Sequence, residues 1–259
     1  MRCVRITARS PPWKICADMP EHALLTIEDH RALRVSTERG IGLGDAVMCA
    51  IAVPSEFRRV QDEYPILFRL NAERDRFTAL AMFGFETGEN LFLDDGKWDA
   101  RYLPLAIDIQ PFLIGGSPSE SGDKQVHIDL ASPRIDGNGA GDGVRLFDED
   151  GRPTPYLESI TDKLGELDLG YRESEAFFAA LDRYKLLEPL TLEIKLDDGS
   201  TNRLVGFHGI DEDRLRELDA ATLGKLHADD HLMPIFMALA SLGRLRELIA
   251  RKNRRIGHG

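Results

Sequence analysis

Residues 190–207 read LTLEIKLDDGSTNRLVGF, and this stretch carries the strongest β-hairpin signal in the chain. Apolar residues occupy every second position of its first half, namely Leu190, Leu192, Ile194 and Leu196. A period of two is typical of a strand with one buried face. The run Asp197-Asp198-Gly199-Ser200 follows, and Asp-Gly is a preferred pair for a tight turn. Together with Thr201–Phe207, which continues as a second strand, the stretch predicts an antiparallel β-hairpin.

The segments on either side of this hairpin have the three- and four-residue spacing of helices. Upstream, one apolar stripe predicts a long helix from Leu157, with Ser174 in one core position. The other members of the stripe are Ile160, Leu164, Leu167, Tyr171, Phe178 and Leu181. Downstream, Asp211 and Asp219 are the predicted N-caps of two short helices. A last helix, about 232–252, is expected to bury Ile235, Phe236, Leu239, Leu242, Leu245 and Ile249.

The first half of the chain contains shorter apolar runs separated by turn residues. The predicted strands are 46–53, 66–70 and 77–85, with a helix predicted over 56–64 after Ser55 as its N-cap. Asp94-Asp95-Gly96 is a predicted hairpin turn. The whole pattern predicts an α+β protein, with a mixed or antiparallel sheet in the N-terminal half. The long helix, the β-hairpin and a C-terminal helical segment are expected to pack on that sheet.

Two regions of different character divide the chain. Residues 22–259 are expected to form a single α+β domain, since no linker separates the predicted elements. Residues 1–21 lack periodicity and are expected to be a disordered tail. An alternative for the first 18 residues is that they precede a natural start at Met19.

Charge and cysteine content restrict the class of protein. The chain carries 33 Lys and Arg against 44 Asp and Glu, a net charge of −11, which opposes binding to the phosphates of nucleic acid. Its three cysteines, Cys3, Cys16 and Cys49, show no CxxC spacing, which fits a reducing compartment. No run approaches the roughly 18 apolar residues of a membrane span, and no apolar core of a secretory signal follows the N-terminal basic residues. We therefore expect a cytoplasmic protein that does not span a membrane.

Two patterns resemble known sites but lack essential parts. His227 and His231 have the spacing of a helical zinc pair, but Ala228 stands where the H-E-x-x-H pattern has its glutamate. Asp229-Asp230 also favours a helix end between the two histidines. The glycine-rich run 137–143 has Asp142 where a dinucleotide fingerprint needs glycine. We therefore expect neither a metal nor a cofactor, and spacing alone selects no catalytic residue.

Several segments match those of one bacterial family in their order and spacing. They are His30–Val35, Val53–Phe57, Glu63–Ile66, Gly88–Phe92, Trp98–Tyr102, Ser132–Arg134, Leu146–Gly151 and Ser241–Gly243. With them the chain resembles the SapC family from about His22 to Lys252, and not the peptide-transporter permease of the same name, which needs membrane spans. One departure is the run 106–112, AIDIQPF, where many relatives have an Arg-Arg-Tyr-Pro-Phe-like run, so a basic contact is not carried over.

The resemblance implies an accessory role. The family is named after a gene in a locus that exports a surface-layer protein. Its proteobacterial members often look like neighbours of TonB-dependent receptors, flavin-dependent halogenase-like proteins and cupin-like proteins. We therefore expect a non-catalytic accessory or binding protein that serves envelope uptake or surface-layer-related machinery. Its expected partner is an envelope receptor, a halogenase-like protein or a small molecule. The alternative is an enzyme with an unrecognised active site that acts on a peptide, amino acid or aromatic substrate.

The candidate binding residues are the polar or aromatic members of the matching segments, because side chains of these types dominate recognition surfaces. They are His30, Arg34, Glu89, Asn90, Trp98, Arg101 and Arg134.

Removal of residues 1–18 is expected to leave the melting temperature unchanged, because a disordered tail contributes no packing. Differential scanning calorimetry of the full and shortened chains is the measurement. A large drop in the melting temperature would contradict the prediction.

Overall fold

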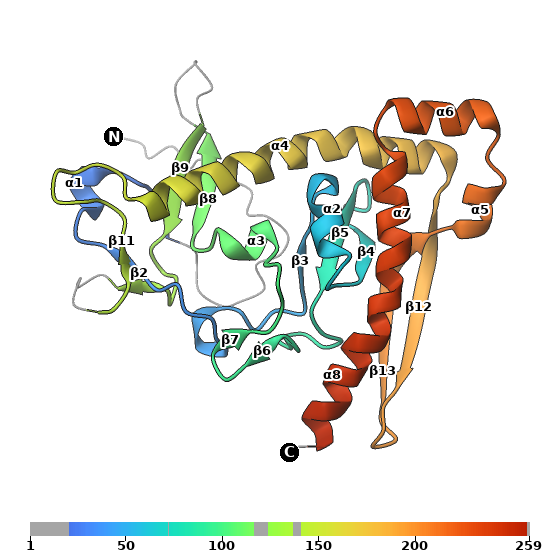
Figure 1. Ribbon diagram of the computed structural model, residues 1–259, viewed down its shortest axis with the longest axis horizontal. Coiled ribbons are helices and arrows are strands. Elements are labelled where there is room, and N and C mark those ends of the chain that lie inside the picture. The colour runs from blue at the N-terminus through green and yellow to red at the C-terminus, as the bar shows by residue number, and fades with distance from the viewer. Residues whose placement is uncertain (1–20, 72, 117–123, 137–140, 258–259) are drawn as a thin grey trace.

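The computed structural model describes residues 21–71, 73–116, 124–136 and 141–257 (Figure 1). Its largest sheet has the strand order β12-β13-β4-β5-β3, and every neighbouring pair is antiparallel. The bounds are β12 Leu187–Lys195, β13 Thr201–Ile210, β4 Ile66–Leu70, β5 Phe77–Met82 and β3 Cys49–Ile51. This sheet joins the N-terminal strands to the hairpin from the second half of the chain.

The predicted hairpin is confirmed as β12 and β13. Its register places Leu192 opposite Leu204 and Ile194 opposite Asn202, with an irregularity between Leu190 and Leu192. Gly199 has a φ of +85°, the left-handed conformation that the turn requires.

Smaller sheets complete the β structure. One has the order β1-β9-β8, another the order β10-β2-β11, and β6 pairs with β7. Their bounds are β1 His22–Leu24, β9 Lys124–Asp129, β8 Phe112–Gly116, β10 Ile135–Asp136, β2 Arg34–Val35, β11 Val144–Arg145, β6 Leu93–Asp94 and β7 Lys97–Trp98. The turn predicted between β6 and β7 is confirmed, since Asp95 and Gly96 have φ values of +42° and +76°.

The helices vary from single turns to one long rod. The α-helices are α1 Ile27–His30, α2 Phe57–Val60, α3 Leu105–Asp108, α4 Pro155–Tyr184, α5 Glu212–Arg216, α6 Ala220–Ala228, α7 Leu232–Ser241 and α8 Leu245–Gly257. The 3₁₀ turns are η1 Ile41–Leu43, η2 Pro54–Glu56 and η3 Leu242–Arg244. Asp211 and Asp219 cap α5 and α6 as predicted, each accepting a backbone N–H three residues ahead.

The helix α4 connects two clusters of buried apolar residues. Leu157 and Ile160, near its start, belong to the smaller cluster, which also contains residues of β2, β8 and β9. Phe177 and Leu181, near its end, belong to the larger cluster. In Figure 1, α4 accordingly runs along one side of most of the molecule.

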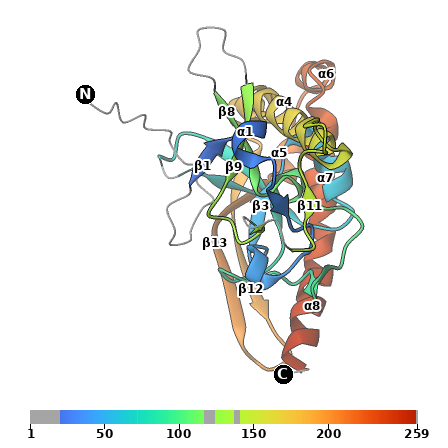
Figure 2. The same cartoon turned by 90° about the vertical axis from the view of Figure 1, so that its left-hand side faces the viewer.

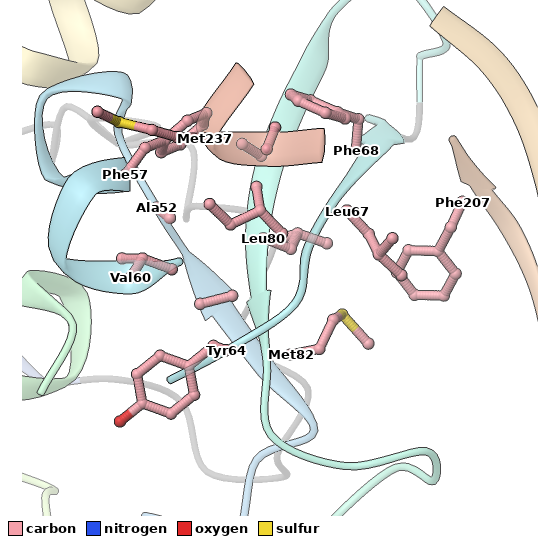
Figure 3. Packing of buried hydrophobic residues seen from close by; sticks show 14 of the residues in the cluster. Ala52, Phe57, Val60, Tyr64, Leu67, Phe68, Leu80, Met82, Phe207 and Met237 are labelled. Carbon is pink, nitrogen blue, oxygen red and sulfur yellow. The ribbon is translucent and has the colours of Figure 1, made fainter. Parts of the chain in front are cut away.

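The larger cluster lies between the five-stranded sheet and the helices α2 and α7. In Figure 3, Leu67 and Leu80 of the sheet lie between Val60 of α2 and Phe207 of β13. Figures 1 and 2 both show α7 and α8 alongside the β12–β13 hairpin, with the end of α8 near the hairpin turn. Asn253 of α8 accepts the backbone N–H of Asp197 there, at 3.2 Å.

Several details of the predicted elements are wrong. The strand predicted over 46–53 is limited to β3. The helix predicted over 56–64 is replaced by the short elements η2 and α2, and the residue at the N-cap of η2 is Val53 and not the predicted Ser55. Tyr171 and Phe236 are about half exposed, at 51% and 50%, although both were predicted to be buried. Tyr171 faces outward because the neighbouring Gly170 lies on the buried face of α4, in close contact with Val53 and Ser55, and Ser174 lies on the same buried face.

The α+β class is confirmed, since antiparallel sheets combine with a long helix, a hairpin and a C-terminal helical segment. Residues 1–20 of the predicted tail lie outside the described residues.

Two glycines of α4 provide a matched test of this packing. A Cβ at residue 170 would lie 2.7 Å from Cγ2 of Val53 and 2.8 Å from Oγ of Ser55, whereas a Cβ at residue 165 would meet nothing within 4 Å. Gly170→Ala is expected to lower the free energy of unfolding by about 1–3 kcal/mol through overpacking. Gly165→Ala is expected to raise it by about 0.5–1 kcal/mol through helix propensity. Urea unfolding measures both, and the same sign for the two variants would contradict the assigned packing.

Candidate functional site

The carboxylate of Asp45 is the centre of a buried polar network. Asp45 is 0% exposed and Arg134 is 2% exposed. Nη2 of Arg134 lies 2.6 Å from Oδ1 of Asp45, and Nη1 of Arg39 lies 3.5 Å from the same oxygen. The backbone N–H of Gly40 donates to the other oxygen at 2.8 Å. The negative charge is therefore balanced by two arginines inside the protein.

Two of the candidate binding residues, Asn90 and Arg134, meet at Asp45. The side-chain amide of Asn90 donates to the backbone carbonyl of Asp45 at 2.8 Å, and its oxygen accepts the N–H of Phe92 at 3.0 Å. Arg134 also donates through Nη1 to the carbonyl of Glu38 at 2.7 Å. Both side chains thus hold loops together, because each one bridges backbone groups of distant segments.

The network extends toward the surface through Arg39. Its Nη2 lies 3.2 Å from Oδ1 of Asp108, and Nζ of Lys163 on α4 lies 2.7 Å from the other oxygen of that carboxylate. Burial and the neighbouring charge of Arg134 lower the pKa of Arg39, while Asp45 and Asp108 oppose the shift. Sequence reasoning missed Arg39, Asp45 and Asp108, and no motif spacing connects them.

The Trp98 side chain is positioned by a hydrogen bond and by a contact with a neighbouring aromatic ring. Its Nε1–H donates to the hydroxyl of Tyr64 at 2.8 Å, and that hydroxyl donates to the carbonyl of Tyr102. Its ring packs edge-on against Phe83, with 5.0 Å between the centroids. Burial raises the pKa of Tyr64, so the hydroxyl keeps the proton that it donates.

A buried glutamate anchors the other end of this aromatic group. Oε2 of Glu56 accepts the hydroxyl of Tyr102 at 2.7 Å and the N–H of Leu105 at 3.1 Å. Its Oε1 accepts the N–H of Val53 at 3.0 Å. Burial raises the pKa of Glu56, and these hydrogen bonds partly oppose the shift. Burial and the charge of Glu56 likewise raise the pKa of Tyr102.

Two ion pairs involve residues that follow Trp98 closely in the chain, Asp99 and Arg101. In the first pair, Nη1 of Arg251 lies 2.7 Å from Oδ2 of Asp99, and its guanidinium lies 4.4 Å from the ring centroid of Phe92. In the second pair, Nε of Arg101 lies 2.9 Å from Oε1 of Glu63. The side chain of Arg101 is 84% exposed, which makes it accessible to a partner.

Glu89 fastens the C-terminal helix to the loop that follows β5. One oxygen accepts the N–H of Phe85 at 2.8 Å, and the other pairs with Lys252 of α8. Burial lowers the pKa of Lys252, but hydrogen bonds to Glu89 and Glu86 outweigh it and raise the pKa overall. The basic end of the last helix is thus partly buried in ion pairs, although a cluster of that kind usually is solvated.

His30 and Arg34 belong to α1 and β2, which Figure 1 places far from α7 and α8. Of the other five candidates, Arg134 lies beside β2, because its carbonyl accepts the N–H of Ser36 at 2.9 Å. His30 is 5% exposed, and its Nδ1 lies 3.2 Å from the N–H of Thr26. Nη1 of Arg34 donates to the carbonyl of Gly143 at 2.7 Å. The structure therefore does not bring the seven residues into one site.

The histidine pair does not form a metal-binding arrangement among the described residues. The helix α6 ends at Ala228, so His227 and His231 do not share one helix face. Within the described ranges, no three histidine, cysteine or acidic residues gather in a metal-binding arrangement. Residues 137–140 of the glycine-rich run lie outside the described residues. The described helices include none that is both long and apolar enough to cross a membrane.

Asp45→Ala tests the importance of the buried network. The change leaves the charge of Arg134 buried without its carboxylate, so the free energy of unfolding is expected to fall by about 3–5 kcal/mol. Glu175→Ala is the control, since Glu175 pairs with Arg76 at 3.6 Å and both side chains are about 70% exposed. Its expected cost is about 0–1 kcal/mol. Equal losses for the two variants in urea unfolding would contradict the central place of Asp45.

Comparison with known proteins connects this architecture to one family. The family model described as SapC matches residues 25–248, which is most of the chain and includes every candidate binding residue. No match was found among the curated proteins or among the solved structures compared with the chain. The resemblance carried by the short segments is thereby confirmed, and the chain belongs to the SapC family.

Proposed function

We propose that this chain is a non-catalytic accessory protein that binds another protein through the surface around Trp98. This Trp98 surface consists of Trp98, Asp99 and Arg101, with the ion-pair partners Glu63 and Arg251. The observation that carries the proposal is the hydrogen bond that fixes the Trp98 ring to Tyr64, with the ion-paired residues Asp99 and Arg101 next in the chain. Tryptophan and arginine supply much of the binding energy at protein interfaces, and surrounding charges form the polar rim.

Rigidity supports the assignment, because a side chain that is already ordered loses less entropy on binding. The Trp98 ring is fixed by Phe83 below it and by the Tyr64 hydroxyl at its nitrogen. Arg101 contributes a guanidinium that is 84% exposed and can exchange Glu63 for a carboxylate of the partner. The surface therefore combines a fixed aromatic anchor with an accessible charge.

The contacts of the candidate residues favour binding over catalysis. Glu89 and Asn90 direct their polar groups at partners inside the protein, and Arg134 does so with Nη1 and Nη2. The buried carboxylate of Glu56 is likewise engaged by three donors. General acid–base work needs a group within reach of a substrate proton, and groups held in this way serve the fold instead. The enzyme alternative thus receives less support than the binding role.

We further propose a cytoplasmic location and a partner within envelope machinery. An envelope receptor or a halogenase-like protein is the partner that membership of the SapC family suggests. The location is supported by three cysteines without CxxC spacing, of which Cys49 is free and has a pKa raised by burial.

Affinity purification from the native host tests the proposal. Proteins that co-purify with the tagged chain are quantified by mass spectrometry for the wild type, Arg101→Glu and Arg76→Glu. Arg101→Glu is expected to reduce recovery of a specific partner about tenfold, since losses above 1 kcal/mol mark an interface hot spot. Arg76→Glu is the matched control, an exposed arginine that also pairs with a glutamate. Identical recovery with both variants would overturn the assignment of the Trp98 surface.

A further inference from the structure

The helix α7 contains no charged residue over its whole length. Its sequence is LMPIFMALAS, residues 232–241. The inner face is formed by the buried residues Pro234, Ile235, Met237, Ala238 and Ser241. The outer face carries Met233 and Phe236, which are 53% and 50% exposed, and the exposed Ala240. The α7 stripe, defined as Met233, Phe236 and Ala240, therefore has the helical spacing of one continuous face.

An apolar outer face is unusual for a surface helix. A helix at a protein surface ordinarily presents polar residues outward, and one that is apolar all round is ordinarily buried. The following helix α8 obeys this rule, because its exposed positions include Arg246, Glu247 and Arg254. The α7 stripe thus matches a helix face that another protein surface covers.

The sizes of the residues along the stripe indicate how two such helices fit together. Its first half carries the bulky residues Met233 and Phe236, and its second half carries Ala240, followed by the exposed Gly243 in η3. Backbone angles at Leu242 and Leu245 remain helical, so α7 continues through η3 as one rod. When two copies of α7 lie antiparallel, the bulky half of each faces the small half of the other.

The charges at the two ends of the stripe favour the same arrangement. Asp229 and Asp230 are exposed at the end that precedes α7. Arg244 and Arg246 are exposed at the end that follows it, and the exposed Glu247 beside them is already paired with Arg251 and Arg254 of its own helix. An antiparallel pair brings the acidic end of each copy toward the basic end of the other, so size and charge are complementary in one orientation.

We propose that a second copy of this chain covers the α7 stripe in a two-fold symmetric dimer. Such an interface is self-complementary, because each patch meets an identical patch across the two-fold axis. The dimer involves different residues from the Trp98 surface, so an experiment that contradicts one proposal does not contradict the other. Three partly exposed side chains supply less area than the roughly 800 Å² that each partner contributes to a stable interface. We therefore expect a weak, reversible dimer, with a dissociation constant on the order of 10–100 µM.

Sedimentation equilibrium over a range of protein concentrations tests the dimer. The mass is expected to rise from 29.0 kDa toward twice that value as concentration increases. Phe236→Glu is expected to hold the mass at 29.0 kDa, since it places a charge at the centre of the stripe. Val205→Glu is the control, because Val205 is an exposed apolar residue of β13 that is 61% accessible. It is expected to leave the association unchanged.

A charge exchange tests the antiparallel orientation. Arg244→Glu is expected to weaken association at least threefold, and adding Asp229→Arg to it is expected to restore the wild-type dissociation constant. A wild-type mass of 29.0 kDa at all concentrations would overturn the proposal, as would equal effects of Phe236→Glu and Val205→Glu. Failure of the double variant to recover would overturn the antiparallel arrangement. None of these results changes the expectation for Arg101→Glu.

Discussion

The ion pair between Asp45 and Arg134 is the interaction on which the arrangement of the loops depends. It binds the segment before β3 to the segment before β10, and through Asn90 it fixes the loop before β6, while the N–H of Gly40 closes the turn around η1. The network lies next to both apolar clusters. Val35, which pairs with Ile135 beside Arg134, belongs to the smaller cluster, and Phe92, which donates its N–H to Asn90, belongs to the larger one. The polar network thus connects two cores that α4 also spans.

Burying that network has a cost that its geometry must offset. Two arginines and a carboxylate lose most of their hydration, and only good hydrogen bonding compensates for the loss. Here the oxygens of Asp45 receive Arg134, Arg39 and a backbone N–H, while Asn90 satisfies its carbonyl. A buried arrangement of this kind contributes specificity, because alternative loop packings would leave a charge unpaired.

The two proposed contact surfaces have different physical origins. Trp98 is positioned by the hydrogen bonds and ring contacts that link Tyr64, Tyr102 and Glu56, so its order derives from the larger core. The α7 stripe derives from a helix whose inner face packs in that same core while its outer face has no polar residue. One core therefore supports both an aromatic anchor with charged neighbours and an apolar face.

Features that depend on residues close together in the chain could be predicted from the sequence. Alternating apolar residues and an Asp-Gly turn predicted the β12–β13 hairpin, and two aspartates that precede apolar-periodic runs predicted the caps Asp211 and Asp219. Short segments that match in their order and spacing predicted the family. Only the tertiary structure decided that Arg134 pairs with Asp45, 89 positions away, and that Tyr171 and Phe236 face outward. Periodicity and turn propensity act between residues a few positions apart. Ion pairing and exposure depend on what the rest of the chain places beside a residue, which no local pattern encodes.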